Sequence, residues 1–529
     1  MDTIRGEIRR VVQEAVKKEW PKIRLDEVLV EVPENNKYGD YSSNIAMQLA
    51  RQVKEEPLKI AEILQKEMLN TKYKIQDTFE KIELSEPGFI NFFVSKEYLQ
   101  NQVKEILRQK EKFGHLKIGK NKKINIEFIS ANPTGPLTIG NARGGVFGDV
   151  LGNVFRVAGY KAEKEYYIND FGNQIIALGH SVLKDKETVY KGDYINKLHK
   201  KVKEKDVFKA GQKTAKIILE EMIKKTVKRM GIQYDNWFWE SQLHKKKEVD
   251  KTIDLLKKKN LVYEKDDAFW FKSRKFQDNR DRVLIKKDGS KTYLAGDIAY
   301  HRDKIEKRRF DKVINVWGAD HAGDVAGLKA GVEALGYKNK VEIVLHQFIT
   351  ILKKGERQRM SKRKGIYFTM DELIEEVGKN VIRFFFLQKT INTHLNFDLD
   401  LAKEESEKNP VYYVQYAYAR ICSIIRKSEK SQIPNPKFNL LEHPSELKLI
   451  KQLVRFPEVV ADVSKDYQVQ KLPQYALDLA AIFHQFYQDC RVISDNKNLS
   501  QSRLALITAT KIIFKNSFDL MGISALRKM

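Results

Sequence analysis

Cysteine is scarce in this 529-residue sequence, which contains two, Cys422 and Cys490. They lie far apart in stretches with helical periodicity, so they match neither a disulfide framework nor a metal-ligand spacing, and we expect no structural metal. Long apolar runs are also lacking, which excludes a membrane-spanning helix and predicts no membrane partner. The charged N-terminal stretch has no signal-peptide pattern. Reduced, buried thiols without a targeting segment predict a cytoplasmic protein.

Acidic residues are few relative to basic ones. The sequence has 71 Asp and Glu against 97 Lys and Arg, which gives a net charge of +26. The lysines are spread along the whole chain, which favours a broad basic face that binds a polyanion over a disordered basic tail. A lysine-rich composition inherited from an AT-rich genome is the alternative explanation.

Residues 124 to 168 have the pattern of a βαβ unit. Apolar and polar residues alternate from Ile124 to Phe128, which is strand periodicity. A turn rich in proline and glycine follows, and helical periodicity begins after Gly140. The turn has neither G-x-G-x-x-G nor G-x-x-x-x-G-K-[ST], so two common nucleotide motifs are excluded. The N-terminus of the helix is still a place to bind phosphate.

The periodicities divide this multidomain α/β sequence into three domains. Residues 1–115 are predicted to form a small α+β domain. Residues 116–395 are predicted to form a Rossmann-type catalytic domain with a charged, helical insertion at about 185–260. Strand signals vanish in residues 396–529, which predicts an all-α domain whose second helix is kinked or split by Pro457.

The turn resembles the first signature of class I aminoacyl-tRNA synthetases. Its flanks, Ser130–Leu137 and Ala142–Gly144, are similar to those of arginyl-tRNA synthetases in particular. Thr138 and Asn141 stand where that signature has its two histidines. Residues Arg359–Arg363 resemble the second signature, Lys-Met-Ser-Lys-Ser, with arginine in its first and last positions.

This resemblance implies an ATP site with Mg²⁺ bound to the substrate. Lys362 would neutralise the pyrophosphate leaving group, and Thr138 and Asn141 would meet the α-phosphate without the charge that histidine can carry. The residues expected around ATP are Pro136, Gly140, Asn141, Gly318, Asp320, His321, Met360, Ser361 and Lys362.

Tyr293 and Asp297 are four residues apart, so on a helix they share one face. A carboxylate beside an aromatic ring suits a guanidinium group. A surface Asp next to a packed Tyr is the alternative for an isolated pair. The resemblance places arginine recognition here and at residues of two strand ends, namely Glu127, Ser130, Asn132, Asp170 and Gln174.

The flanking domains resemble the tRNA-binding domains of the same family. In the N-terminal domain, which touches the tRNA elbow in the family, Asn36 and Tyr38 are expected to contact RNA. In the helical domain Tyr413, Tyr416 and Arg420 recur at helical spacing, and the resemblance assigns them and Met529 to the anticodon loop. Such an aromatic stripe is more often part of a core.

Taken together, the resemblance implies arginine–tRNA ligation. ATP and L-arginine would form arginyl-adenylate, and tRNA(Arg), needed already for activation, would receive the arginyl group. We expect a monomer. Two alternatives stay open: a non-catalytic tRNA-binding paralogue, favoured by the missing histidines, and a class I synthetase for another cationic amino acid, with lysine the nearest competitor.

Overall fold

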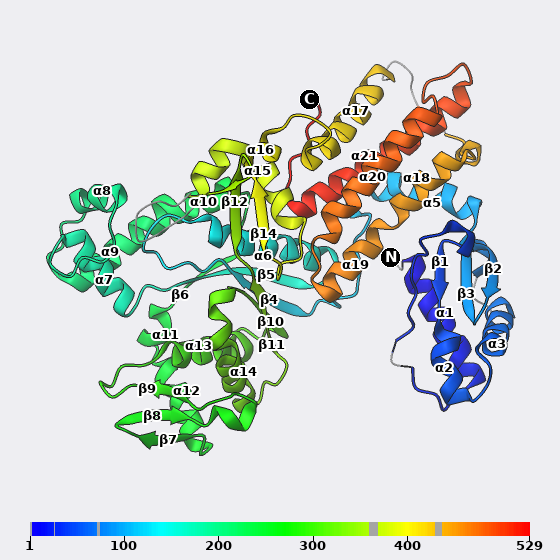
Figure 1. Ribbon diagram of the computed structural model, residues 1–529. Coiled ribbons are helices and arrows are strands. Elements are labelled where there is room, and N and C mark those ends of the chain that lie inside the picture. Colours follow the sequence, from blue (N-terminus) through cyan, green and yellow to red (C-terminus); the bar gives the residue numbers. More distant parts are fainter. Residues whose placement is uncertain (1–2, 26, 71–74, 359–368, 429–435) are drawn as a thin grey trace.

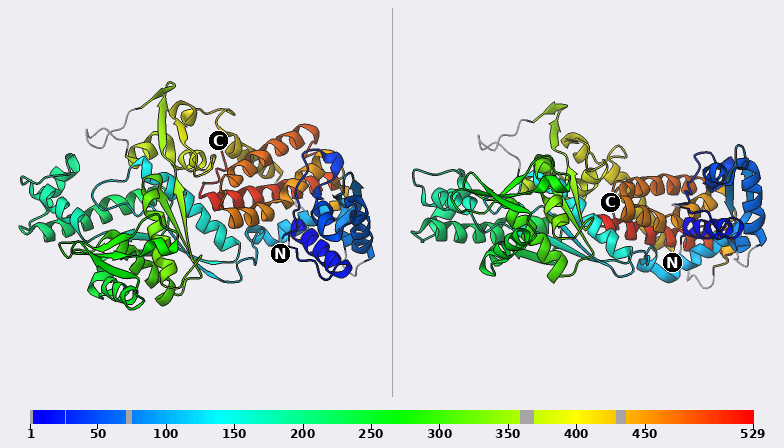
Figure 2. Two further views of the ribbon diagram at one scale, coloured as in Figure 1. Left: turned by 60° about the horizontal axis from the view of Figure 1, so that its bottom comes forward. Right: turned by 90° about the horizontal axis from the view of Figure 1, so that it is seen from below.

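The computed structural model describes residues 3–25, 27–70, 75–358, 369–428 and 436–529. Three parts follow one another along the chain (Figure 1). The N-terminal part lies at one end of the molecule and contacts the C-terminal helices, and the catalytic sheet lies toward the other end in all three views (Figures 1 and 2). No helix among the described residues is long and apolar enough to span a membrane.

The N-terminal part is an α+β unit, as predicted. Its antiparallel sheet has the strand order β1-β3-β2. The turn at Glu86–Gly88 joins β2 to β3, with Leu84 opposite Ile90. The elements of this unit are α1 (Ile4–Glu19), β1 (Tyr41–Ser43), α2 (Ile45–Val53), α3 (Pro57–Asn70), α4 (Ile75–Thr78), β2 (Phe79–Ser85) and β3 (Phe89–Val94).

The central sheet confirms the Rossmann-type prediction. Its five strands are parallel in the order β11-β10-β4-β5-β6. Helix α6 (Ile139–Val157) connects β4 to β5. Because the strand order reverses between β4 and β10, a ligand crevice is expected at their carboxyl ends. The strands are β4 (Lys123–Phe128), β5 (Lys161–Ile168), β6 (Asn236–Trp239), β10 (Lys312–Gly318) and β11 (Val341–His346).

Strand β6 corrects one prediction. Residues 185–260 were expected to be helical, but β6 lies within them and forms the edge of the central sheet. The strand is four residues long, so its alternation is too short to stand out between lysine-rich helices. Its aromatic side chains pack on β5, where Tyr166 and Trp237 stack with ring centroids 4.7 Å apart. The α-helices of this stretch are α8 (Asp193–Lys201), α9 (Val207–Ile218), α10 (Lys224–Arg229), α11 (Ser241–Lys245) and α12 (Glu248–Lys258).

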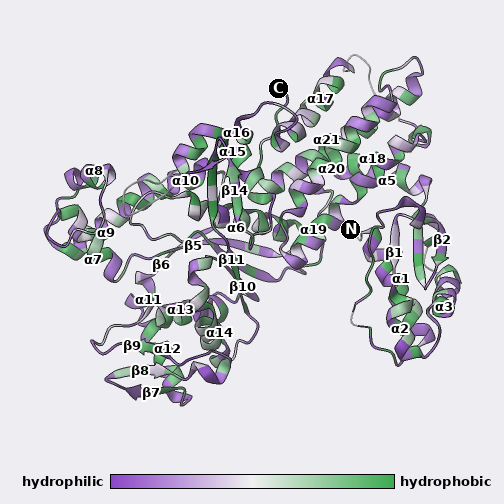
Figure 3. Ribbon diagram, viewed as in Figure 1, coloured by the Kyte–Doolittle hydropathy of each residue, from purple (hydrophilic) through white to green (hydrophobic). Residues whose placement is uncertain are grey.

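A second, smaller lobe lies between β6 and β10 in sequence. It contains the antiparallel sheet β7-β8-β9, which leads directly into α13. Its elements are β7 (Val262–Lys265), β8 (Ala268–Phe271), β9 (Arg282–Ile285) and α13 (Tyr293–Arg302). Figure 3 shows hydrophilic residues over most of its loops, in keeping with the 32% charged content of the chain.

Further elements complete the catalytic part around the sheet. They are α7 (Asn173–Leu183), α14 (Val325–Ala334), β12 (Ile349–Lys353), β13 (Glu356–Arg357), α15 (Met370–Leu387), β14 (Leu395–Asp398) and α16 (Leu399–Lys403).

The C-terminal part is a helical bundle, as predicted. Pro457 splits its second predicted helix, because α18 ends at Val454 and α19 begins at Phe456. Helix α5 (Lys96–Gln109) falls within the first predicted domain, residues 1–115, but it packs against α18 and α21, and Gln100 donates to the carbonyl of Leu441 over 3.1 Å. The bundle helices are α17 (Pro410–Ser428), α18 (Pro444–Val454), α19 (Phe456–Asp466), α20 (Lys471–Asp489) and α21 (Lys497–Met521).

Polar contacts hold the N-terminal unit against α19. Arg5 donates to both carboxylate oxygens of Asp462 over 2.8 Å, and its backbone N–H donates to Glu458 over 2.9 Å. Tyr41 donates to the same Glu458 oxygen over 3.1 Å. Burial raises the pKa of Glu458, while Arg5 counteracts that shift. The interface therefore depends on a paired, buried carboxylate.

Candidate active site

The backbone turns sharply where β4 ends. Ile129 and Ser130 both have left-handed backbone, with φ of 64° and 40°. This conformation is costly for a β-branched residue and persists only where neighbouring groups hold it. Tyr234 supplies such a hold, because its hydroxyl donates to the carbonyl of Phe128 over 2.8 Å. Backbone strain of this kind is typical of ligand sites.

Helix α6 packs very closely on β4. A Cβ at Gly148 would lie 2.4 Å from the ring of Phe128, and one at Gly145 would lie 2.6 Å from Ile129. Only glycine allows this approach, which brings the N-terminus of α6 to the carboxyl end of β4. The free N–H groups and dipole of that terminus favour an anion.

The two residues in place of the signature histidines bond to each other at this terminus. The Oδ1 of Asn141 accepts from the backbone N–H of Thr138 over 3.2 Å and from its hydroxyl over 3.0 Å. Asn141 thereby caps α6 together with Thr138. Gly140 between them is exposed, and Pro136 is half-buried before them. The predicted ATP residues of this turn thus lie together.

The second signature, with Met360, Ser361 and Lys362, lies outside the described residues. The described residue that follows it, Thr369, forms a β-bridge with Thr138. The next backbone N–H, of Met370, donates to the carbonyl of Leu137 over 2.9 Å. The segment that begins at Thr369 therefore lies beside the first signature.

The end of β10 carries three further predicted ATP residues. Gly318 is the last residue of β10, and Asp320 and His321 follow in the short helix η6 (Ala319–Asp324). Both side chains are exposed, and His321 Nε2 lies 3.8 Å from a carboxylate oxygen of Asp320. Because β10 pairs with β4, these residues face the same crevice as the α6 terminus.

The carboxyl group of Asp297 on α13 lies near the carboxyl groups of Glu127, Glu240 and Asp324. Burial, followed by the charges of Glu127 and Glu240, raises the pKa of Asp297 to about 8. Tyr293, one helical turn earlier, is 60% exposed, and burial together with the same Glu240 raises its pKa. The pair thus shares a helix face, as predicted, and this negative surrounding suits a cationic side chain.

Glu127, near the end of β4, acts on Asp297 and forms an ion pair of its own with Lys304. The fully buried ammonium of Lys304 lies 2.7 Å from Glu127 Oε2 and 3.5 Å from Glu165 Oε1. The hydroxyl of Ser130 donates to the other oxygen of Glu127 over 3.1 Å. The charge of Glu127 is therefore paired and its orientation fixed, whereas the carboxyl group of Asp297 forms no ion pair within the part of the chain that the structure describes.

Three other predicted arginine residues occupy different places. The carboxylate of Asp170 accepts from the backbone N–H of Ser241 over 2.8 Å and so caps α11. Gln174 lies half-buried in the first turn of α7, and Asn132 lies half-buried in the turn after β4. Their contact with arginine stays a prediction.

Glu240 is a site residue that the sequence did not reveal. It directly follows β6, is buried, and lies beside His244, whose Nε2 is 3.4 Å from Glu240 Oε1. It raises the pKa of Asp297 and of Tyr293. Recognising β6 as a core strand would have placed Glu240 at a strand end, where ligands bind.

The residues predicted to contact tRNA lie on the two outer parts. Asn36 and Tyr38 are exposed in η1 (Asn36–Tyr38), with the Lys37 ammonium 4.7 Å from the Tyr38 ring. Tyr413 is half-buried on α17, and the exposed Tyr416 lies 5.4 Å from the Arg420 guanidinium. Met529 is exposed at the end of the chain. These positions are open to an RNA, and their contacts with it stay predictions.

No metal centre is evident in the described ranges, since they contain no cluster of three or more His, Cys, Asp or Glu able to hold an ion. The glycine-packed helix terminus and the switch point beside it suit a nucleoside triphosphate.

The sheet order, the α6 terminus and the carboxylate pocket define a class I aminoacyl-tRNA synthetase. The model for "tRNA synthetases class I (R), catalytic domain" matches residues 102–210 and 183–390. Models for the arginyl tRNA synthetase N terminal domain and the DALR anticodon binding domain match residues 3–94 and 414–529. The chain belongs to the arginyl-tRNA synthetase family, and class I membership implies ATP as a substrate.

Full-length relatives support this membership. The arginine–tRNA ligase of Acetivibrio thermocellus is 40% identical over 565 residues, covering 100% of this chain and 99% of that protein. The one of Caldanaerobacter subterraneus subsp. tengcongensis is 42% identical, covering 96% and 94%. The structure of Thermus thermophilus arginyl-tRNA synthetase matches with a TM-score of 0.80 at 21% identity over 100% of both chains, which indicates a common fold.

Proposed function

We propose that this chain is an arginine–tRNA ligase. It activates L-arginine with ATP to arginyl-adenylate and pyrophosphate, and it transfers the arginyl group to the terminal ribose of tRNA(Arg). The observation that carries this proposal is Asp297, which shares a face of α13 with Tyr293 and forms no ion pair within the described residues, while Glu127 and Glu240 act on its carboxyl group. A guanidinium bound there would relieve the mutual repulsion of these groups.

The α6 terminus would bind the phosphates of Mg²⁺-ATP. Its N–H groups remain oriented because Thr138 and Asn141 cap the helix, and Gly140 leaves the backbone accessible. Neither capping residue carries a positive charge, so the proposal assigns more of the charge neutralisation to Lys362 and to the Mg²⁺ of the substrate. Bound tRNA is required for activation, and the protein acts as a monomer.

Arginine-dependent ATP–pyrophosphate exchange in the presence of tRNA tests the proposal. We expect exchange with arginine and none above background with lysine. The ammonium group of lysine is a point charge and cannot bind a carboxylate in the bidentate manner of a guanidinium. Exchange with lysine alone would indicate a synthetase for that amino acid.

A non-catalytic paralogue is the second candidate, and the neutral pair Thr138 and Asn141 is the observation that favours it. Such a protein would bind tRNA without exchange or aminoacylation. Measuring tRNA binding and exchange on the same preparation separates the two candidates, because binding without any exchange would reject the ligase.

A further inference from the structure

The carboxylate of Glu240 lies against the helix that carries Asp297. Glu240 directly precedes α11, and its Oε1 lies 3.7 Å from the point that a Cβ at Gly296 of α13 would occupy. Gly296 is the residue before Asp297, and burial, together with the charge of Glu240 among others, raises the pKa of Asp297 to about 8. The pocket around Asp297 therefore has the Glu240 carboxylate in its wall, and the direction of that carboxylate decides what it offers to a cation.

The imidazole of His244 contacts both this carboxylate and an aromatic ring. His244 lies one helical turn after Glu240, and its Nε2 is 3.4 Å from Glu240 Oε1. An ionised carboxylate can only accept a hydrogen bond, so Nε2 carries the proton in this contact. The ring of Phe171 stacks on the imidazole, with ring centroids 4.1 Å apart and an angle of 20° between the planes. The stack therefore holds the imidazole where it can donate to Glu240.

The loop after β5 holds the other oxygen of the same carboxylate. Asn169 is buried and, with its amide oriented to satisfy both acceptors, donates to Glu240 Oε2 over 3.1 Å and to the carbonyl of Phe171 over 2.8 Å. Asp170 accepts from the backbone N–H of Ser241 over 2.8 Å, which fixes the start of α11. One short loop therefore supports the helix, the imidazole and the carboxylate together.

An ordered carboxylate binds a guanidinium better than a mobile one. Ordering a free side chain during binding lowers affinity, and two parallel hydrogen bonds from a guanidinium require a carboxylate of fixed direction. In this protein the donors His244 and Asn169 order Glu240 before any ligand arrives. Each carboxylate oxygen has a second lone pair, so Glu240 can accept from a guanidinium while it keeps both donors.

We propose that His244 is a positioning residue for arginine. Its N–H directs the carboxylate of Glu240 toward the guanidinium group, and the ring of Phe171 keeps the imidazole in place. His244 acts through Glu240 and not by contact with the amino acid. The inference rests on the proposed function, because it takes arginine as the ligand of the pocket around Asp297.

Calorimetric titration with L-arginine tests this role in three variants that separate the ring of His244 from its N–H. His244→Phe keeps a ring that can stack on Phe171 but has no donor, and we expect its dissociation constant for arginine to rise about fivefold. His244→Gln keeps a donor at the same helical spacing and should stay within about twofold of the unchanged protein. His244→Ala lacks both and should resemble His244→Phe. The KM for ATP should stay the same in all three.

Combination with Glu240→Ala decides whether His244 acts through that carboxylate. Where the carboxylate is missing, His244→Phe should leave the dissociation constant for arginine unchanged, so the two effects should not add. An effect of His244→Phe that persists without Glu240 would overturn the role. An arginine affinity that is unchanged in His244→Phe would overturn it too, and so would a higher one, which would mean that the imidazole competes with the guanidinium.

His180→Phe is the matched control. His180 on α7 has its Nδ1 2.7 Å from a carboxylate oxygen of Asp185, and its side chain is 17% exposed, against 18% for His244. No contact of His180 with Glu240 or α13 is found in the described ranges. The same substitution at a histidine of the same exposure should therefore leave arginine binding as in the unchanged protein.

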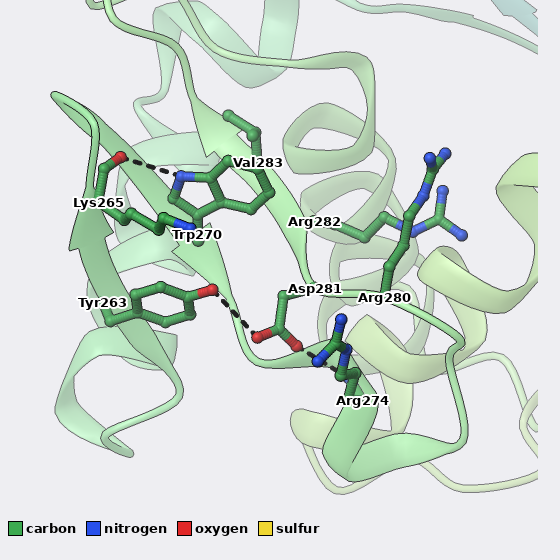
Figure 4. Close-up of a pocket in the computed structure, with 8 residues that line it drawn as sticks. All are labelled: Tyr263, Lys265, Trp270, Arg274, Arg280, Asp281, Arg282 and Val283. Atoms are coloured by element: carbon green, nitrogen blue, oxygen red, sulfur yellow. Dashed lines mark hydrogen bonds between the residues drawn. The ribbon is translucent and has the colours of Figure 1, made fainter.

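Tyr263→Phe is a second control, because it also removes a donor from a carboxylate. The Tyr263 hydroxyl donates to Asp281 over 3.1 Å in a hollow of about 510 Å³, whose lining residues belong to neither α11 nor α13 (Figure 4). Arginine binding should again be unchanged. If either control weakens it as much as His244→Phe does, the effect is not specific to Glu240 and the positioning role is rejected.

Titration and ATP–pyrophosphate exchange on the same preparations separate this inference from the proposed function. Arginine binding with the expected differences, but without any arginine-dependent exchange, would reject the ligase and keep the positioning role. Exchange with arginine together with equal dissociation constants in all variants would reject the positioning role alone. An unchanged protein that does not bind arginine would reject both.

Discussion

Asn141 accepts two hydrogen bonds from Thr138, one from its backbone and one from its hydroxyl, across the first turn of α6. These two positions carry histidines in the class I signature, and here they form a closed, neutral cap. The cap preserves the shape and the dipole of the helix terminus. What it lacks is a positive charge, so the chain keeps the phosphate-binding geometry and gives up charge-assisted bonds from this turn.

Asn141→Ala should lower the rate of arginine-dependent ATP–pyrophosphate exchange about fivefold, equivalent to roughly 1 kcal/mol for a lost cap. The reason is that the first N–H groups of α6 lose their fixed direction. Asn141→Asp keeps the acceptor for Thr138 but places a negative charge beside the phosphates. It should fold like the unchanged protein and still lose more exchange than Asn141→Ala. An unchanged rate in both variants would contradict a role for this terminus in ATP binding.

Arginine affinity should depend on pH through Asp297. The pKa of this carboxyl group is raised to about 8 in the free protein by burial and by Glu127 and Glu240. Below pH 8 the group is protonated, so binding of the guanidinium must release a proton, and the dissociation constant for arginine should fall as pH rises from 6 to 8 and level off above. Calorimetry in two buffers of different ionisation enthalpy measures that proton release. An affinity independent of pH would contradict this arrangement.

Glu240→Gln provides the matched test of the cause. Removing this neighbouring charge lowers the pKa of Asp297, so the pH dependence of arginine binding should move to lower pH. Arginine affinity itself should fall, because one of the carboxylates facing the cation is lost.

Asp297→Asn should remove the pH dependence and raise the arginine KM by about a hundredfold, while the ATP KM stays within about twofold. A large change in the ATP KM would place Asp297 outside the amino-acid pocket.

The sequence predicted those parts of the site whose position follows from local periodicity. The alternation of Ile124 to Phe128 placed Glu127 at the end of a strand, and the spacing of Tyr293 and Asp297 placed both on one helix face. Glu240 was missed because it depends on β6, a strand that exists through aromatic packing on β5 rather than through its own pattern.

Long-range charge pairing was equally invisible in the sequence. Lys304 is one lysine among many in the chain, and nothing around it indicates that its ammonium is buried against Glu127 and Glu165. Likewise, the helical pattern of α5 is clear, but its sequence cannot show that it packs among the C-terminal helices. Such features come from the tertiary arrangement, which local periodicity does not encode.

Lys304→Met should destabilise the catalytic part by about 3–5 kcal/mol, because it leaves Glu127 buried without its cation. Burial favours a raised pKa for Glu165, but Lys304 and Arg308 bring it to about 2. In the unchanged protein the Glu165 carboxylate is therefore ionised in the fold between pH 7 and 5. In the variant Glu165 loses the cation that contributes most to lowering its pKa, so the difference in stability between the two proteins should become smaller as pH falls over that range. Urea unfolding at pH 5 and 7 measures the difference.

Lys304→Met combined with Glu127→Gln is the control for that experiment. It removes both members of the pair and should recover much of the stability at pH 7, since no unpaired charge remains at the position of Glu127. A double variant as unstable as Lys304→Met would show that packing of the lysine stem, rather than its charge, holds this part together.

Arg420 and Tyr416 on α17 offer a test of the helical domain. The Arg420 guanidinium lies 5.4 Å from the Tyr416 ring and 4.7 Å from the Tyr487 ring, and both rings are more than a third exposed, at 38% and 36%. Rings and a cation that face solvent together can stack on splayed bases. Arg420→Ala should weaken tRNA binding at every salt concentration and reduce the slope of log affinity against log salt by about 1, without changing the arginine KM. Loss of thermal stability with unchanged tRNA affinity would instead assign these side chains to packing of the bundle.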